Sequence, residues 1–243
     1  ESFDIDLFLS STTKSLEIVA SKIYTKGIGA PSRIFCVLSS PWYVSQTRVI
    51  KLEKNIPFIF TSKIADNLIQ KEIALFEEDY SAKYMNAKSP VRAIEFKNIK
   101  TMLNGYETPN PLNQKTKELE MTIFISVCGE QVLKKIEETI KKHFYFKEIK
   151  FSSFVLSSFA VMRDMYIHQS NFLLIDIGGE VTDISMIKKN VLHGSISFPL
   201  GFNFIIRGVA AALNCSLSEA KSSISLFKDG HATESVAKKL GSV

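Results

Sequence analysis

Residues 171–201 read NFLLIDIGGEVTDISMIKKNVLHGSISFPLG, and this stretch decides the fold. It holds three short runs rich in strand-forming residues, 171–177, 182–188 and 191–198. The second and third runs are separated by only two residues, which is the spacing of a tight hairpin. The sequence therefore predicts an antiparallel meander of three strands.

The loop between the first two of these strands carries the residues that suggest chemistry, Asp176-Ile177-Gly178-Gly179-Glu180-Val181-Thr182-Asp183. Paired glycines let backbone N–H groups approach a phosphate closely, because no Cβ stands in the way. Carboxylates beside such a loop suit Mg²⁺ or an attacking water. We therefore expect Gly178, Gly179 and Thr182 to bind phosphate, and Asp176 and Asp183 to hold the metal. A glycine-rich hairpin with aspartates at its ends and no ligand is the alternative that this motif leaves open.

The composition is that of an ordinary globular protein. The chain has 243 residues, of which 45% are hydrophobic and 23% charged, so disorder, collagen-like repeats and disulfide scaffolds are excluded. The formal net charge of +5 is spread over local lysine pairs rather than gathered in a basic stripe with aromatic residues between. This argues against a nucleic-acid partner.

The cysteines and the apolar runs indicate the compartment. Cys36, Cys128 and Cys215 form no CxxC pair, so we expect buried thiols in a reducing environment. No apolar run reaches the roughly 18–20 residues that cross a bilayer, and residues 1–30 lack the pattern of a signal peptide. We therefore expect a cytoplasmic protein. The four histidines are scattered, without the spacing of a metal site.

Outside the meander, hydrophobic periodicity predicts a mixed α/β chain. The expected helices are 12–26, 62–76, 130–143, 153–166, 201–213 and 216–228, and the expected strands are 33–39, 42–52, 57–61, 91–103, 118–127 and 147–151. We expect strand 33–39 to pair with strand 42–52. Thr61 or Ser62 is the expected N-cap of the second helix, and Ser216 that of the last. Near 165–170 the pattern changes from alternating strands and helices to three strands in quick succession. This change predicts two domains, 1–165 and 166–243.

The stretch 173–221 resembles the second phosphate loop and following helices of the actin-like ATPases. Within these it is most similar to the FtsA family of bacterial cell-division proteins, with PilM-like pilus-assembly proteins close behind. The resemblance is strong over 130–225 and loose over 1–129. It implies a partial actin-like, ribonuclease-H-like fold in the α/β class, with a small inserted strand-helix-strand subdomain within 1–165. It also implies that the first phosphate loop and most of the C-terminal half lie outside this sequence.

The resemblance also assigns a nucleotide site residue by residue. Asp176, Gly178, Gly179, Thr182 and Asp183 match the family's phosphate loop, and Gly201 matches the first glycine of a pair that approaches the nucleotide. The chain departs from the family pattern at five positions, which are Glu180, Val181, Phe202, Lys221 and Ile224. The last two stand where the family contacts the adenosine. We therefore expect a degenerate site, with weak or absent binding of ATP and Mg²⁺ and weak or absent hydrolysis.

The resemblance implies an FtsA-like cytoplasmic scaffold that assembles the cell-division machinery through protein contacts of the inserted subdomain. Two alternatives stay open: a PilM-like protein of type IV pilus assembly, and an active actin-like ATPase switched by its nucleotide. The implied partners are other division or pilus proteins, with self-association possible. The resemblance implies membrane contact only indirectly or through a C-terminal segment outside this sequence, at the inner face of the plasma membrane.

Overall fold

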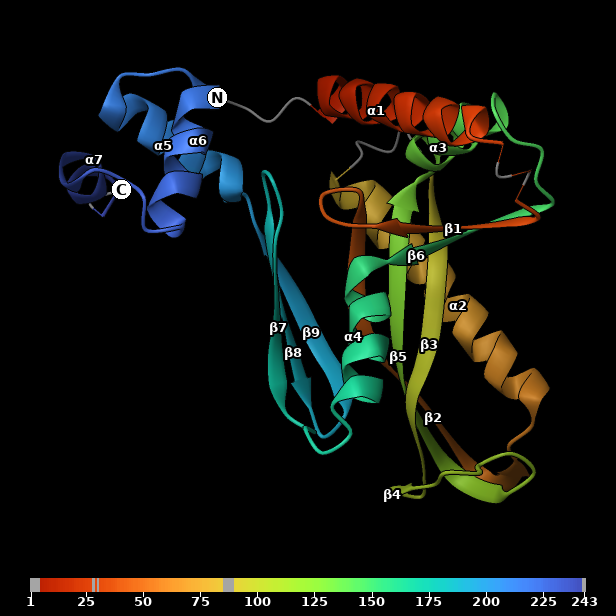
Figure 1. Cartoon of the computed structure of the whole chain (residues 1–243). Helices are drawn as coiled ribbons and strands as arrows, with labels where there is room; N and C mark the ends of the chain where they lie inside the picture. The colour runs from red at the N-terminus through yellow and green to blue at the C-terminus, as the bar shows by residue number, and fades with distance from the viewer. Residues whose placement is uncertain (1–4, 28, 30, 85–89, 242–243) are drawn as a thin grey trace.

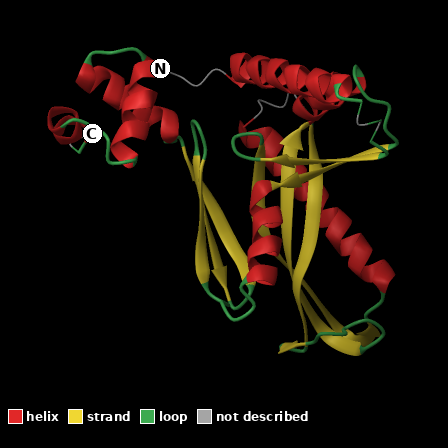
Figure 2. Cartoon of the chain, in the orientation of Figure 1, coloured by secondary structure: helices red, strands yellow, loops and turns green. Residues whose placement is uncertain are grey.

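The computed structural model describes residues 5–27, 29, 31–84 and 90–241. They form a mixed α/β chain (Figures 1 and 2). The helices are α1 (Ile5–Thr25), α2 (Ser62–Tyr84), α3 (Glu130–Lys141), α4 (Phe154–Met165), α5 (Phe202–Leu213), α6 (Leu217–Lys228) and α7 (Glu234–Leu240). The strands are β1 (Arg33–Leu38), β2 (Tyr43–Ile59), β3 (Val91–Leu103), β4 (Tyr106–Glu107), β5 (Lys115–Gly129), β6 (Glu148–Ser153), β7 (Phe172–Ile177), β8 (Thr182–Lys188) and β9 (Val191–Phe198).

Strand β5 is the centre of the largest sheet. It lies between β2 and β3 in an antiparallel sheet of order β2-β5-β3-β4 (Figure 1). Its side chains alternate between two buried faces, as successive residues of a strand must. Ile123 and Ile125 belong to one hydrophobic cluster, whereas Phe124 and Cys128 belong to another. The sheet is therefore covered on both faces along residues 123–128 of β5.

Helix α2 covers one face of this sheet. Thr61 is its N-cap, since its Oγ1 accepts a hydrogen bond from the backbone N–H of Ile64 at 3.4 Å. Ile69, Ile73 and Phe76 lie at helical spacing and pack into the cluster that holds the inner residues of β5. The helix extends well beyond the predicted residues 62–76.

The other face of β5 joins the four-stranded sheet to the rest of the fold. Phe124 shares a buried cluster with Leu133 and Ile136 of α3 and with Val155 and Phe159 of α4. Ile187 of β8 and Leu192 of β9 belong to the same cluster. The proposed boundary between 1–165 and 166–243 therefore has hydrophobic contacts across it, and the division into two domains stays a prediction.

Two expectations about the N-terminal strands are wrong. Strand β1 does not pair with the strand that follows it. It pairs in parallel with β6, while β2 pairs with β5. The run 57–61 does not form a third strand either, because residues 57–59 are the end of β2, which resumes its pairing with β5 after an irregularity between Glu53 and Phe58.

The C-terminal part follows the predicted pattern. Strands β7, β8 and β9 form the antiparallel meander. Helices α5, α6 and α7 gather beside it, at the left of Figure 1, around a small core of their own that includes Ile206, Val209 and Ala220. Ser216 caps α6 as predicted, in a capping box with Glu219.

The cysteines are free thiols. Cys128 is buried, and Cys36 and Cys215 are partly buried. Burial raises the pKa of Cys36 to about 11, and burial together with nearby acidic groups raises that of Cys128 to about 12. Both thiols therefore stay protonated near neutral pH, as in structural rather than reactive cysteines. In the described part of the chain, no helix is long and apolar enough to cross a membrane.

Candidate functional site

The glycine loop, residues 177–182, connects β7 to β8 at one end of the meander. Its backbone N–H at Gly178 donates to the carbonyl of Val181 at 2.9 Å, which closes the loop on itself. A Cβ at Gly178 would lie 2.9 Å from that same carbonyl oxygen. Glycine is needed there because the turn leaves no room for a side chain.

The loop is fastened to the start of α5 by main-chain hydrogen bonds. The N–H groups of Phe202 and Asn203 donate to the carbonyls of Gly178 and Gly179, both at 2.8 Å. At Gly201 a Cβ would fall within 2.6 Å of the Gly178 oxygen and would also overlap the carbonyl of Gly179. The structure thus brings Gly201 against the two loop glycines and shows why a side chain is excluded there.

The Thr182 hydroxyl adds a side-chain contact to the same junction. Its Oγ1 donates to the carbonyl of Leu200 at 2.6 Å, so the hydroxyl faces the segment that leads into α5. This donor is engaged within the protein. A phosphate would therefore meet the lone pairs of this oxygen or displace the contact.

The two predicted metal ligands lie side by side. Asp176 and Asp183 are directly opposite each other on β7 and β8, so their side chains project to the same face of the sheet. Asp183 is only 5% exposed, and its Oδ1 accepts a hydrogen bond from Ser40 Oγ at 2.8 Å. Burial and the neighbouring Asp183 together raise the pKa of Asp176 above its usual value. A cation between the two carboxylates would relieve this repulsion.

We expect Asp176→Asn to raise the thermal unfolding midpoint at pH 7 in Mg²⁺-free buffer. A carboxyl whose folded pKa is raised costs stability when it is ionised, and the cost disappears as the pH falls through that pKa. The neutral amide removes the cost, so the advantage of the variant should vanish near pH 3. Scanning calorimetry at both pH values measures it.

Mg²⁺ provides the matched test of the metal assignment. If Asp176 and Asp183 hold the cation, millimolar Mg²⁺ raises the midpoint of the wild-type protein and leaves that of Asp176→Asn unchanged. An equal response of both proteins to Mg²⁺ would remove Asp176 from the metal site. A lower midpoint for the variant in Mg²⁺-free buffer would show that the carboxylate stabilises the fold.

Glu180 occupies the tip of the loop and is tied to α5. Its Oε1 accepts from Asn203 Nδ2 at 3.0 Å and from Arg207 Nη1 at 3.2 Å, and its Oε2 accepts from Arg207 Nη2 at 3.0 Å. Hydrogen bonds from Arg207 and then from Asn203 lower the pKa of this carboxyl. The family pattern has glycine at this position, and here the side chain is an anion held in place by a two-pronged contact.

The positions expected to contact the adenosine carry other roles. Ile224 is partly buried and packs against the small core of α5, α6 and α7. Lys221 is exposed one turn earlier on α6. Phe202, which stands at another departure from the family pattern, uses its backbone N–H to bind the loop.

Three residues of the site were missed by sequence reasoning. Asn203 and Arg207 stand four residues apart on α5, which places them on one face of a helix, and that spacing could have pointed to them. Ser40 could not have been found, because it lies 143 residues before Asp183 in the chain, in the connection between β1 and β2.

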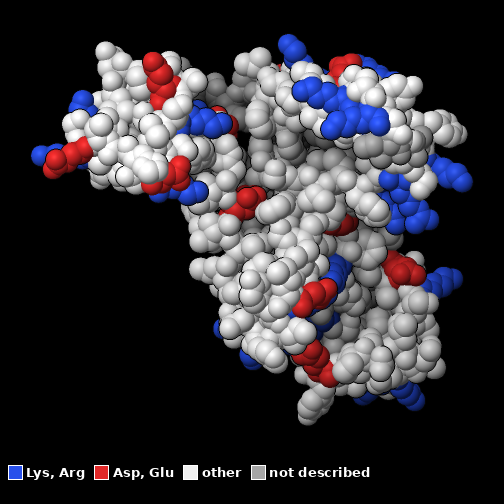
Figure 3. Space-filling view, viewed as in Figure 1, with Lys and Arg blue, Asp and Glu red and all other residues white. Residues whose placement is uncertain are grey.

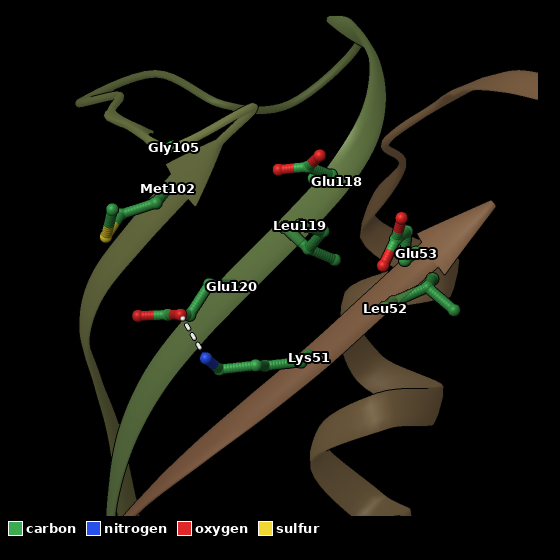
Figure 4. A pocket seen from close by; sticks show the side chains of 8 residues that line it. All are labelled: Lys51, Leu52, Glu53, Met102, Gly105, Glu118, Leu119 and Glu120. Atoms are coloured by element: carbon green, nitrogen blue, oxygen red, sulfur yellow. Dashed lines mark ion pairs between the residues drawn. The ribbon is translucent and has the colours of Figure 1, made fainter. Parts of the chain in front are cut away.

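A separate hollow of about 280 Å³ lies on the four-stranded sheet (Figure 4). Its lining comes from β2, the end of β3, Gly105 and β5, with Lys51 paired to Glu120 at 3.2 Å. Its acidic groups are Glu53, Glu118 and Glu120. Within the part of the chain that the structure describes, no three or more His, Cys, Asp or Glu side chains, these three included, are grouped so that they could hold a metal ion together.

The surface charges are mixed (Figure 3). On the face shown, Lys and Arg side chains gather most densely over the region of α1, with Asp and Glu side chains interspersed over the rest of that face. Several of these charges form exposed ion pairs, such as Lys142 with Glu17. This pattern differs from the continuous basic stripe of a nucleic-acid-binding surface.

Comparison with solved structures shows the fold. A chain of the PilM-PilN type IV pilus biogenesis complex is similar with a TM-score of 0.55 and 14% sequence identity, over 92% of this chain and 60% of that chain. The ethanolamine utilization protein EutJ from Carboxydothermus hydrogenoformans gives a TM-score of 0.31 and 14% identity, over 45% of this chain and 36% of that one. No protein-family model and no curated protein matches the sequence. The chain therefore has the actin-like α/β fold in part, spanning 60% of the length of the pilus protein.

Proposed function

We propose that this protein is an actin-like scaffold with a degenerate ATP site, which acts in the assembly of a machine of the bacterial cell envelope. The observation that supports this proposal best is the position of Glu180, whose carboxylate is held in the phosphate loop by Asn203 and Arg207. The loop has the paired glycines that we expect of a phosphate site, while its tip carries a carboxylate held in place by Arg207 and Asn203.

Electrostatics decides how this charge affects a nucleotide. At an effective dielectric of about 20, two unit charges about 4 Å apart interact by roughly 4 kcal/mol. Glu180 and a phosphate of the nucleotide would repel each other by an energy of this order. The positive charge of Arg207 offsets part of that repulsion, but its guanidinium is engaged with Glu180. Hydrogen bonds to charged groups are worth about 1.5–3 kcal/mol each, so the adenosine contacts absent at Lys221 and Ile224 weaken binding further.

The four-stranded sheet supports the scaffold role, because its core does not depend on a ligand. β5 is buried on both faces, and α2 packs along one of them. The part of this sheet around Lys51 and Glu120 presents an open hollow lined by charged and apolar side chains. We propose that partners dock on this part of the chain.

Two observations favour different roles, one in cell division and the other in pilus assembly. Sequence resemblance favours an FtsA-like role in cell division. The structural similarity to a chain of the PilM-PilN complex favours a PilM-like role in type IV pilus assembly. In both cases we propose protein partners and action at the cytoplasmic face of the membrane.

A nucleotide-switched ATPase is the second candidate. It is favoured by the geometry that the loop retains, with Asp176 opposite Asp183 and Gly201 against the two loop glycines. In this role the Glu180 carboxylate would leave Arg207 when ATP binds.

Calorimetric titration of the protein with ATP and Mg²⁺ separates the two candidates. We compare wild type with Glu180→Gly/Val181→Thr/Lys221→Glu, which restores the family pattern. For a scaffold we expect no heat of binding with wild type up to millimolar ATP and measurable binding with the triple variant. Micromolar binding by wild type would exclude the degenerate site and place the protein among the nucleotide-switched ATPases.

A further inference from the structure

We propose that Glu180, Asn203 and Arg207 form a clamp that holds the glycine loop closed on α5 without any ligand. The inference rests on the proposed function, because a scaffold without nucleotide needs another means of fixing its helical part to its sheet. The clamp consists of this chain's own residues, and it predicts a junction whose closure is independent of ATP.

The geometry of the clamp is that of a strong anion contact. Both oxygens of Glu180 are used by the Arg207 guanidinium, at 3.2 and 3.0 Å, and Asn203 adds a third hydrogen bond at 3.0 Å. A planar guanidinium matches a carboxylate in this way and fixes its orientation as well as its position. The Glu180 side chain is 28% exposed and that of Arg207 is 51% exposed, so water screens much of the charge while the geometry of the contact is kept.

Main-chain hydrogen bonds beside the clamp also join the glycine loop to α5. The N–H groups of Phe202 and Asn203 bind the loop carbonyls at 2.8 Å. The start of a helix ordinarily attracts anions through such N–H groups. In this chain the loop carbonyls take up two of them, and the carboxylate of Glu180 accepts from the Asn203 side chain at the same helix start.

The clamp lies where the C-terminal helices join the meander. Helices α5, α6 and α7 pack around their own small core, with Ile206 and Ala220 buried in it. They stand beside the meander in Figure 1 rather than across its sheet. The junction at Gly201 and the clamp therefore determine how this helical group is held on β7–β9.

Hydrogen exchange measured by NMR at the Phe202 and Asn203 amides tests the clamp. The comparison uses wild type, Glu180→Gln and Arg207→Gln, with Lys221→Gln as a matched control that changes an exposed charge on α6. We expect both clamp variants to exchange about three- to tenfold faster than wild type, as the loss of partly exposed charged hydrogen bonds implies. The control should exchange as wild type does, and Arg207→Lys should fall between.

Adding ATP with Mg²⁺ to the same samples separates this inference from the proposed function. Protection in wild type that is complete without ATP supports the clamp, and equal exchange in wild type and in both clamp variants overturns it. Wild-type amides that become protected only on adding ATP also overturn it. Tight ATP binding by calorimetry, together with ligand-free protection that the variants lose, leaves the clamp in place and refutes the degenerate site.

Discussion

Replacing Gly201 with alanine is expected to open the junction between the glycine loop and α5. The new Cβ would lie within 2.6 Å of the Gly178 oxygen and against the carbonyl of Gly179, both main-chain atoms that cannot rotate away. The backbone at Gly201 has a φ of −131°, which alanine adopts freely, so the effect comes from the overlap alone. Forced overlap of this kind costs about 1–3 kcal/mol, and fixed main-chain partners put Gly201→Ala near the upper end.

Chemical denaturation and amide exchange both measure this effect. The Phe202 and Asn203 amides should lose their protection, and the free energy of unfolding should fall by about 3 kcal/mol. Gly194→Ala in β9 is the matched control, because a Cβ there meets nothing within 4 Å. If Gly201→Ala kept wild-type stability and protection, the loop would have to sit farther from α5 than the structure places it.

Replacing Phe124 with alanine is expected to lower the free energy of unfolding by about 3–5 kcal/mol. Phe124 lies on central strand β5, is 1% exposed, and belongs to the cluster that joins α3, α4 and the meander. Truncation removes the buried ring and leaves a cavity that its neighbours fill only in part. Since domains of this kind have about 5–15 kcal/mol of stability in total, the loss is a large fraction of it.

Urea unfolding followed by fluorescence suits this measurement. Trp42, the only tryptophan of the chain, packs against the same cluster and is stacked on Phe8. Phe96→Ala is the matched control, because Phe96 lies on the neighbouring strand β3 and is 48% exposed. A loss for Phe124→Ala no greater than that for Phe96→Ala would contradict the packing described for β5.

Local pattern in the sequence was sufficient for the elements with regular periodicity. The meander and the N-cap at Ser216 were predicted from the local sequence, because neighbouring residues determine a tight turn and a helix start. Helix α2 was predicted too short, since residues after Phe76 are charged. It continues because Glu77 accepts from the Ala93 N–H at 2.6 Å and Asp79 pairs with Arg48.

Local sequence patterns could not predict which strands pair when the strands are far apart in the chain. The partner of β1 is β6, which begins at Glu148, and no local signal distinguishes that pairing from the hairpin that was expected. The same limit applies to the site. The residues of the glycine loop were identified from the motif and Gly201 from the resemblance. The structure places Asp176 opposite Asp183, and Gly201 against Gly178 and Gly179. The partner of Glu180 lies 27 residues later on α5 and came only from the three-dimensional arrangement.

The central place of β5 has a consequence for synthesis on the ribosome. Its neighbours β2 and β3 both precede it in the chain, so neither can complete its pairing until Gly129 has been added. Between the end of β2 at Ile59 and that point lie about 70 residues, or roughly 4–14 seconds of translation at about 5–20 residues per second. Until β5 is synthesised, the 17-residue strand β2 lacks the strand with which it pairs in the folded sheet. The order of the strands therefore makes completion of this sheet wait for β5.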